Sequence, residues 1–451
     1  MGHGPRRSLS PTGGEGRGEW ARSDASAPPP CHDAPVTALA RLREIDWTGL
    51  DDLGPSLDDP LAEVLAGAPA ERVLDRLLRA RPGLGRAGRR AAAEALFGVG
   101  LWRRRLRWHL SGASETPRLL LALLLRDLAA RADAAALCGL APSDLPPPRP
   151  PPQALADRWS LPDWLAEALT AAAGDEAGAL AEALCRPGPI FLRVNALLAT
   201  PAALAARLLA EGVATRPGAL AAGCLEVTSP RPNLLGLGAW RDGWFEVQDE
   251  GSQLVAEALG ARPGEVVLDR CAGAGGKALA LAAAVGPGGR VHCCDLDEGR
   301  LRRLATRAER AGASAVVVRH GAAPPPGQVV DRALVDAPCS ELGPLRRGPD
   351  LRWRLDPAGF AGLPALQGAL LAEAAARVRP GGRLGYATCT FRGAENEGVA
   401  LAFEAGHPGW RRVAPALPPA VVGPDGFVRT LPHRHGTDGF FAAAWERRER
   451  P

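Results

Sequence analysis

The chain has 451 residues, and 46% of them are hydrophobic, which allows two or three domains with buried cores. The formal net charge of only +4 excludes binding to nucleic acid through overall charge, so local basic segments would have to provide it. The nine cysteines contain no C-x-x-C pair, which argues against a metal site, and their odd number is typical of a reducing, cytoplasmic environment. No apolar run approaches the roughly 20 residues of a membrane helix. We therefore expect a monomer with no metal and no membrane partner.

The N-terminal third is predicted to be helical and to be joined to the rest by a linker. Residues 1–35 are rich in Gly, Pro, Ser and Arg and show no periodicity, which predicts a disordered tail. Residues 36–141 show apolar residues at helical spacing and predict a helical domain. The proline-rich run over residues 142–153 favours an extended linker. Residues 154–235 follow as a small mixed subdomain.

Residues 236–451 alternate short apolar runs with helices, which predicts a doubly wound, Rossmann-like parallel sheet of the α/β class behind an N-terminal all-helical domain. Arg379-Pro-Gly-Gly382 is predicted to end the last helix. The strands are predicted over residues 265–269, 290–295, 315–319, 332–336 and 383–388, and the helices over 277–285, 297–311 and a segment with Leu366, Leu370, Ala374 and Val378 on one face.

A glycine-rich loop follows the first of these strands and opens a helix, over residues 268–277. Gly273, Gly275 and Gly276 let the backbone pass close to a ligand. Asp295 ends the next strand, where a carboxylate can accept both hydroxyls of a ribose. This pattern indicates an adenosine site, although a dinucleotide fold or a tight structural turn would also produce it.

Two cysteine-containing segments, Val335–Ser340 and Tyr386–Thr390, end neighbouring predicted strands. Ligands bind at the carboxyl edge of such sheets, so Cys339 and Cys389 are expected to face one cleft. Buried, inert thiols are the alternative. A cytosine ring explains the pair, because addition of a thiolate at carbon 6 activates carbon 5 toward a methyl sulfonium, and the thiolate later leaves.

Rare residues stand out because arginine replaces lysine almost everywhere. Lys277 is the only lysine and Tyr386 the only tyrosine. A lysine that survives this bias indicates a position that needs a compact ammonium group, with chance survival as the alternative.

Together these segments resemble those of the Sun-type, RsmB-like family of RNA (cytosine-5) methyltransferases, over about residues 155–446. The family carries a D-x-C-A-A-P-G-G-K loop, a D-A-P-C-S loop and a T-C-[ST] loop, which correspond to Asp269–Lys277, Asp336–Ser340 and Thr388–Thr390. Further matching segments are Arg193–Asn195, Val247–Gln253, Leu345–Trp353, Glu395–Glu397 and Asp438–Phe441.

The resemblance implies S-adenosyl-L-methionine as cofactor and RNA, expected to be ribosomal, as substrate. It implies that Cys389 is the nucleophile, that Cys339 assists its release, and that Asp336 contacts the target base or the cofactor. Lys277 joins them as a catalytic residue that favours the thiolate. The roles of the two cysteines could be exchanged, as in the DNA cytosine enzymes. The implied cofactor-binding residues are Asp269, Cys271, Ala272, Gly273, Ala274, Gly275, Gly276, Lys277, Asp295, Arg300, Asp336 and Pro338.

The sequence departs from the family pattern at three positions. Ala274 replaces a proline and is expected to loosen the loop, Ala322 replaces an acid that meets the adenine, and Glu341 replaces a small residue. These departures keep open an RNA-binding protein of ribosome assembly without turnover. A methyltransferase for protein or small molecules is a third possibility, but it would need no paired thiols.

Two basic segments are candidates for RNA contacts, and residues 36–141 correspond to the place of a NusB-like RNA-binding domain in bacterial members. Trp102–His109 interleaves aromatic residues with arginines, which suits phosphate pairing and base stacking but also an ordinary solvated face. The second group follows the D-A-P-C-S loop and comprises Arg346, Arg347, Arg352 and Trp353.

Overall fold

The computed structural model describes residues 38–230, 232–320, 327 and 329–449, without the side chains of residues 319 and 320. The predicted tail over residues 1–35 and the position of Ala322 lie outside the described residues. Within the described part, no helix is long and apolar enough to cross a membrane.

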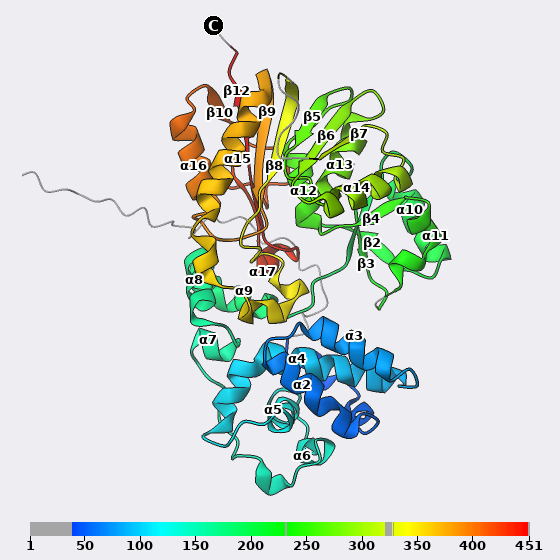
Figure 1. Cartoon of the computed structure of the whole chain (residues 1–451), viewed down its shortest axis with the longest axis vertical. Helices are drawn as coiled ribbons and strands as arrows, with labels where there is room; N and C mark the ends of the chain where they lie inside the picture. Colours follow the sequence, from blue (N-terminus) through cyan, green and yellow to red (C-terminus); the bar gives the residue numbers. More distant parts are fainter. Residues whose placement is uncertain (1–37, 231, 321–326, 328, 450–451) are drawn as a thin grey trace, which may run out of the picture. The chain divides into compact units, whose positions relative to one another are not determined.

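The first described segment is helical (Figure 1). Its longest helix, α4, buries Trp102 and Leu106 against Trp47 and Leu61. Thr116 caps the next helix by accepting a hydrogen bond from the Leu119 N–H, and this helix continues in one wide turn over Leu124–Leu128. The helices are α1 (Ala40–Arg43), α2 (Asp58–Leu65), α3 (Ala70–Ala80), α4 (Arg86–Leu110), α5 (Pro117–Leu123) and α6 (Ala134–Leu137).

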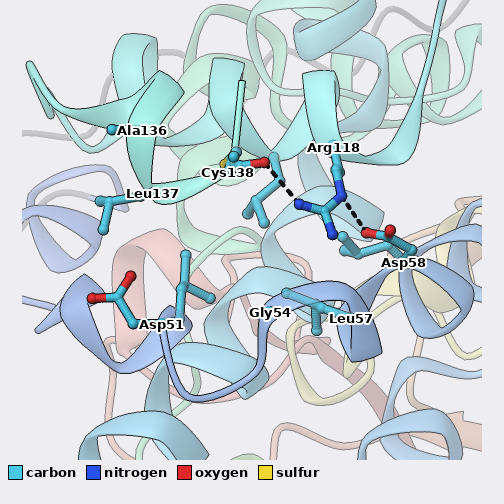
Figure 2. A pocket seen from close by; sticks show the side chains of 12 residues that line it. Asp51, Gly54, Leu57, Asp58, Arg118, Ala136, Leu137 and Cys138 are labelled. Carbon is cyan, nitrogen blue, oxygen red and sulfur yellow. Dashed lines mark hydrogen bonds and ion pairs between the residues drawn. The ribbon is translucent and has the colours of Figure 1, made fainter. Parts of the chain in front are cut away.

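A cavity of about 250 Å³ lies among these helices (Figure 2). Apolar side chains such as Leu57 line it, together with Asp58 and Arg118. The Arg118 guanidinium donates to the Cys138 carbonyl at 2.9 Å and pairs with Asp58 at 2.7 Å. Arg118 and Asp58 therefore neutralise one another in the lining of the cavity, which also contains Asp51.

The proline-rich segment begins with a 3-10 turn over Pro142–Asp144, and its remaining residues, which form no helix or strand, are fastened to α4. The Arg149 guanidinium lies over the Trp108 ring, 4.3 Å from its centroid, and donates to the Trp108 carbonyl. The Trp108 indole in turn donates to the Pro150 carbonyl at 3.3 Å.

A small four-stranded antiparallel sheet follows three helices, with the strand order β2-β3-β1-β4. Its last strand lies beyond residue 235, so the sheet extends past the predicted start of the catalytic part. The elements are α7 (Leu155–Arg158), α8 (Asp163–Ala173), α9 (Ala177–Ala183), β1 (Phe191–Val194), α10 (Pro201–Ala210), β2 (Thr215–Pro217), β3 (Cys224–Val227), α11 (Gly238–Arg241) and β4 (Phe245–Val247).

The large sheet has the order β10-β12-β9-β8-β5-β6-β7, and β11 pairs with β12. The five strands from β9 to the β7 edge run parallel, and β12 is antiparallel to β9. The strands are β5 (Val266–Asp269), β6 (Arg290–Asp295), β7 (Val316–His320), β8 (Val330–Asp336), β9 (Val378–Thr388), β10 (Trp410–Arg412), β11 (Val428–Thr430) and β12 (Phe440–Arg447).

Successive residues of the central strands enter two separate cores, as the period of two requires. Val267 joins the core under helices α12, α13 and α14, and Leu268 joins the core under helices α15 and α16. The predicted doubly wound α/β fold is confirmed. The helices are α12 (Glu250–Ala258), α13 (Gly276–Val285), α14 (Glu298–Arg310), α15 (Leu363–Arg377), α16 (Glu397–Gly406) and α17 (Pro432–His435).

Arg379–Gly382 marks the end of a helix, as predicted, because α15 ends at Arg377. The next strand begins earlier than predicted: β9 starts at Val378, which pairs with Val330 of β8 across an irregularity in register, so Arg379–Gly382 lies inside β9. Gly381 adopts a positive φ of 69° there, a conformation that glycine reaches without strain. The carboxyl ends of β5, β6, β8 and β9 carry Asp269, Asp295, Asp336 and Thr388.

Candidate active site

The glycine loop connects β5 to α13 in a conformation that requires glycine. Gly273 and Gly275 have φ values of 53° and 92°. A Cβ on Gly275 would lie 2.1 Å from a methyl carbon of Leu304, whereas the space beside Gly273 is open to 4 Å. The Gly273 N–H donates to the Asp295 carboxylate at 2.8 Å, so the loop and the end of β6 are held together.

The loop is also held at Ala274, which we expected to loosen it. The Ala274 carbonyl accepts a hydrogen bond of 2.6 Å from Arg307 of α14. Arg307 is itself fixed by Glu246, a carboxylate that is 2% exposed and lies 2.8 Å away. Arg307 of α14 therefore restrains the loop at Ala274, where the missing proline led us to expect a looser backbone.

Asp269 is a buried carboxylate, and apart from the nearby Cys271 N–H its oxygens have no hydrogen-bond donor among the described residues. Burial, with a further contribution from the charge of Asp336, raises its pKa from 3.8 to about 7. A buried carboxylate with so few donors is costly to a fold, so its presence beside the open loop indicates a place for a donor or cation.

Lys277 opens α13 and forms an ion pair of 2.7 Å with Asp336 at the end of β8. Burial opposes its charge, but Asp336 outweighs burial and raises the pKa of Lys277. Its ammonium lies 5.3 Å from the centre of the Phe440 ring. The only lysine of the chain is thus placed between the glycine loop and the two cysteine segments.

The two thiols that the sequence placed in one cleft lie together. The sulfur atoms of Cys339 and Cys389 are 3.4 Å apart, because β8 and β9 are neighbours in the sheet. The contact with Cys339, then burial and the charge of Asp336, raise the pKa of Cys389 well above its ordinary value, while Lys277 lowers it. These influences disfavour the thiolate, so Cys389 needs to lose a proton before it can act as a nucleophile.

The other implied cofactor-binding residues differ in their surroundings. Ala272 donates its N–H to the Cys294 carbonyl at 3.0 Å, and burial raises the pKa of the neighbouring Cys271 to about 12, so this thiol is inert. Pro338 is exposed beside Cys339. Arg300 is exposed on α14, 3.5 Å from the Asp297 carboxylate, and no contact among the described residues brings it to the loop.

The sequence assigned no role to Glu395, although Glu395–Glu397 was among the matching segments. The structure places its carboxylate in full burial between the two cysteine segments, 2.7 Å from the Ser340 hydroxyl. No periodic pattern in the sequence marks Glu395 as buried between the two cysteine loops. The only signal that could have pointed to it was its position shortly after Thr388–Thr390.

The interpretation of Arg346 and Arg352 as RNA-facing side chains is wrong. Arg346 is 7% exposed and pairs with Asp438 at 2.6 Å. Arg352 is fully buried and donates to backbone carbonyls, including that of Leu184 at 3.0 Å. The guanidinium groups of both arginines already donate to carboxylates and carbonyls of the protein, so these donors are not free to bind RNA phosphates.

The remaining basic candidates are also largely engaged within the protein. Trp102 is buried in the helical core. Arg104 pairs with Asp157 at 2.6 Å and Arg107 with Glu115 at 2.7 Å. Two further candidates contact other segments: Arg103 lies over the Trp353 ring, and Arg347 pairs with Asp249 and Asp438.

Comparison with known proteins gives consistent results. The model of the family described as 16S rRNA methyltransferase RsmB/F matches residues 256–446, and the ferredoxin-like domain of RsmF/B-like methyltransferases matches residues 161–233. The probable ribosomal RNA small subunit methyltransferase B of Synechocystis sp. is 36% identical over 303 residues, which cover 64% of this chain and 67% of that protein. Its counterpart in Bacillus subtilis is 35% identical over 314 residues, 66% of this chain and 69% of that one.

Solved structures share the fold. A methyltransferase homolog protein from Pyrococcus horikoshii is 26% identical, with a TM-score of 0.58, and the match covers 65% of this chain and 97% of that one. The crystal structure of PH0851 covers 89% of this chain and 99% of its own, with a TM-score of 0.71 and 24% identity, which shows the fold alone.

Proposed function

Because the chain belongs to the RsmB/F family of 16S rRNA methyltransferases, we propose that it methylates carbon 5 of cytosine in ribosomal RNA through a covalent cysteine adduct. The observation that carries this proposal is the pair of thiols 3.4 Å apart beside the Lys277–Asp336 ion pair. A methyltransferase for protein or small molecules would need no such pair. The alternative of a binding protein without turnover loses support at Ala274, because Arg307 holds the loop there.

S-adenosyl-L-methionine fits the glycine loop as methyl donor. The open backbone at Gly273 admits a ligand, and the oxygens of Asp269 offer acceptors for its cationic groups. Asp295 accepts from the Gly273 N–H through one oxygen and from the Asp297 N–H through the other, and these bonds orient its carboxylate at the end of β6 for a ribose. When bound, the cofactor supplies an electrophilic methyl group to carbon 5.

The attacking group is Cys389, whose thiol proton passes to bulk water before its sulfur forms a bond to carbon 6 of the base. Asp336 accepts a hydrogen bond from the amino group of the base. This contact draws the Asp336 charge away from Lys277, which is left to favour the Cys389 thiolate. The ion pair thus couples recognition of cytosine to activation of the nucleophile.

Cys339 assists release. After carbon 5 carries the methyl group, a base removes its proton, the electron pair of that C–H bond forms the C5–C6 double bond, and the bond from carbon 6 to Cys389 breaks. Cys339 lies next to Cys389, where it can take part in this proton transfer.

The test uses the two alanine variants with 16S rRNA, bisulfite sequencing and denaturing gels. Cys389→Ala should abolish methylation and give no covalent complex. Cys339→Ala should accumulate a protein–RNA complex that survives denaturation, because attack proceeds and release stalls. Trapping by the Cys389 variant would mean that the roles are exchanged. Methylation at wild-type rate in both variants would refute the covalent mechanism.

A further inference from the structure

A single carboxylate lies between the two thiol-bearing loops. Glu395 is fully buried, and its two oxygens accept four hydrogen bonds. The Ser340 hydroxyl and the Arg392 guanidinium donate to one oxygen at 2.7 and 2.9 Å. The Ser340 N–H and the Gln367 amide donate to the other at 2.9 and 3.0 Å. These four donors fill the acceptor capacity of an ionised carboxylate.

The network extends to the second loop in a defined direction. The Ser340 hydroxyl donates its proton to Glu395. The Ser340 oxygen, 2.9 Å from the Thr390 hydroxyl, is therefore the acceptor in that contact. Ser340 follows Cys339 and Thr390 follows Cys389, so the chain of hydrogen bonds joins the two thiol loops at the residue next to each sulfur.

The turn that carries Glu395 is itself fixed to β9. The hydroxyl of Tyr386 donates to the Glu395 carbonyl at 2.5 Å. Asn396 accepts from the Thr388 hydroxyl at 2.5 Å and donates to the Thr390 carbonyl at 3.0 Å. These contacts anchor the carboxylate to the same strand that ends at the Cys389 loop.

We propose that Glu395 is a positioning residue that holds the sulfur atoms of Cys339 and Cys389 at bridging distance. It touches neither sulfur and acts through Ser340 and Thr390. Glutamine in its place keeps one acceptor oxygen and presents an NH2 group instead of the other, so two of the four buried donors lose their acceptor and meet a donor, and the two loops separate to find other partners. The catalytic consequence of this separation rests on the proposed function, but the geometric claim about the thiols does not.

The geometric claim is tested with phenylarsine oxide, a trivalent arsenical. Its arsenic forms one bond to each of two neighbouring thiols, and the oxygen leaves as water with the two thiol protons. We expect the full-length wild-type protein to bind it tightly, and Cys339→Ala to bind it with the weaker affinity of the remaining thiols. Glu395→Gln should lose at least about tenfold in affinity and approach the Cys339 variant, because the second thiol no longer adds to binding.

The matched control is Glu397→Gln, two residues along the chain, whose carboxylate pairs with Arg429 at 2.7 Å and not with either thiol loop. It should bind the arsenical like the wild type. If Glu395→Gln does not fold, Ser340→Ala is the second test. It breaks the same series of hydrogen bonds but leaves the backbone N–H of residue 340 in place, and its affinity for the arsenical should also fall. Wild-type affinity in a folded Glu395→Gln or Ser340→Ala protein overturns the proposal.

Methyl transfer is measured separately in the same variants. Glu395→Gln should lower kcat at least about tenfold with KM for RNA unchanged, because substrate contacts remain while the thiols are misplaced. If Glu395→Gln loses arsenical affinity while Cys389→Ala still methylates RNA, only the covalent mechanism is refuted. Glu395 then remains the positioning residue. An unchanged arsenical affinity refutes the role of Glu395 whatever the methylation results.

Discussion

Replacement of Asp269 by asparagine should stabilise the protein and weaken the binding of S-adenosyl-L-methionine that we propose for the glycine loop. The carboxylate is 1% exposed, and its pKa is raised from 3.8 to about 7, mainly by burial. A rise of this size means that the ionised group costs the folded state about 4 kcal/mol above pH 7. An unpaired asparagine amide in the same place costs about 1–3 kcal/mol. We therefore expect a net gain of about 1–3 kcal/mol in the free energy of unfolding near pH 8.

The sign of the pH dependence follows from the direction of the shift. Between about pH 4 and pH 7 the unfolded chain has an ionised Asp269, whereas the folded protein keeps it protonated. The folded state binds one more proton in this window, so the wild type loses stability as the pH rises, and the loss is complete above about pH 7. Asp269→Asn does not lose stability in this way. The difference in the free energy of unfolding between this variant and the wild type should therefore grow by about 2 kcal/mol between pH 5.5 and pH 8.

The assay is urea unfolding of both proteins at pH 5.5, 6.5, 7.5 and 8.5, with S-adenosyl-L-methionine affinity measured by calorimetry. Asp331→Asn is the control: although burial opposes it, hydrogen bonds from the Val266 N–H and Arg379 lower the pKa of Asp331. The ionised Asp331 carboxylate contributes its full stabilisation above its ordinary pKa. Asp331→Asn should therefore be less stable than the wild type by a constant amount from pH 5.5 to pH 8.5. A constant difference for Asp269→Asn as well would refute the reasoning, because it would show an ionised Asp269 throughout.

Three other substitutions have definite expected outcomes. Glu341→Gly should raise the free energy of unfolding by about 0.5–1 kcal/mol in a urea titration, because φ is 54° at this position and glycine relieves the strain at some cost in chain entropy. Arg352→Ala should lower stability by about 3 kcal/mol, since it leaves buried carbonyls such as that of Leu184 unpaired, and a filter-binding assay on the folded fraction should show unchanged RNA affinity. Lys277→Arg should reduce methyl transfer at least about tenfold at an unchanged melting temperature, because a guanidinium does not replace a compact ammonium 2.7 Å from Asp336; wild-type rates would contradict this.

The sheet and the meeting of the two thiols could be predicted because both depend on local patterns. Each strand from β5 to β8 lies within two residues of its predicted bounds, since short apolar runs between turn residues mark buried parallel strands. The cysteine segments follow two consecutive strands of that pattern. Once β8 and β9 are neighbours, the positions of Cys339 and Cys389 at the ends of these strands follow from the geometry of the sheet.

The environment of the charged residues could not be predicted in the same way. A basic run such as Leu345–Trp353 has the composition of a solvated surface, and only a partner distant in sequence shows that it is not one. Arg346 is neutralised by Asp438, 92 residues away. The four donors to Glu395 likewise come from three separate segments of the chain. Pairings of this kind depend on tertiary contacts that leave no periodic signal in the sequence.

The charges around the glycine loop suggest why the fold retains a buried acid with so few donors. Three carboxylates, Asp269, Asp295 and Asp336, surround the loop, and Lys277 is the ammonium among them. This imbalance suits a ligand with positive charge, and in the proposed function the methyl donor carries a sulfonium that the product has lost. A cation beside Asp269 would lower its pKa and offset the cost of ionisation, and this gain contributes to the affinity for the cation. The product keeps the ammonium of the methyl donor but not its sulfonium, so its charge contributes less. Asp269→Asn should therefore weaken binding of the methyl donor more than binding of the product, and the carboxylate that destabilises the fold is the one that favours product release.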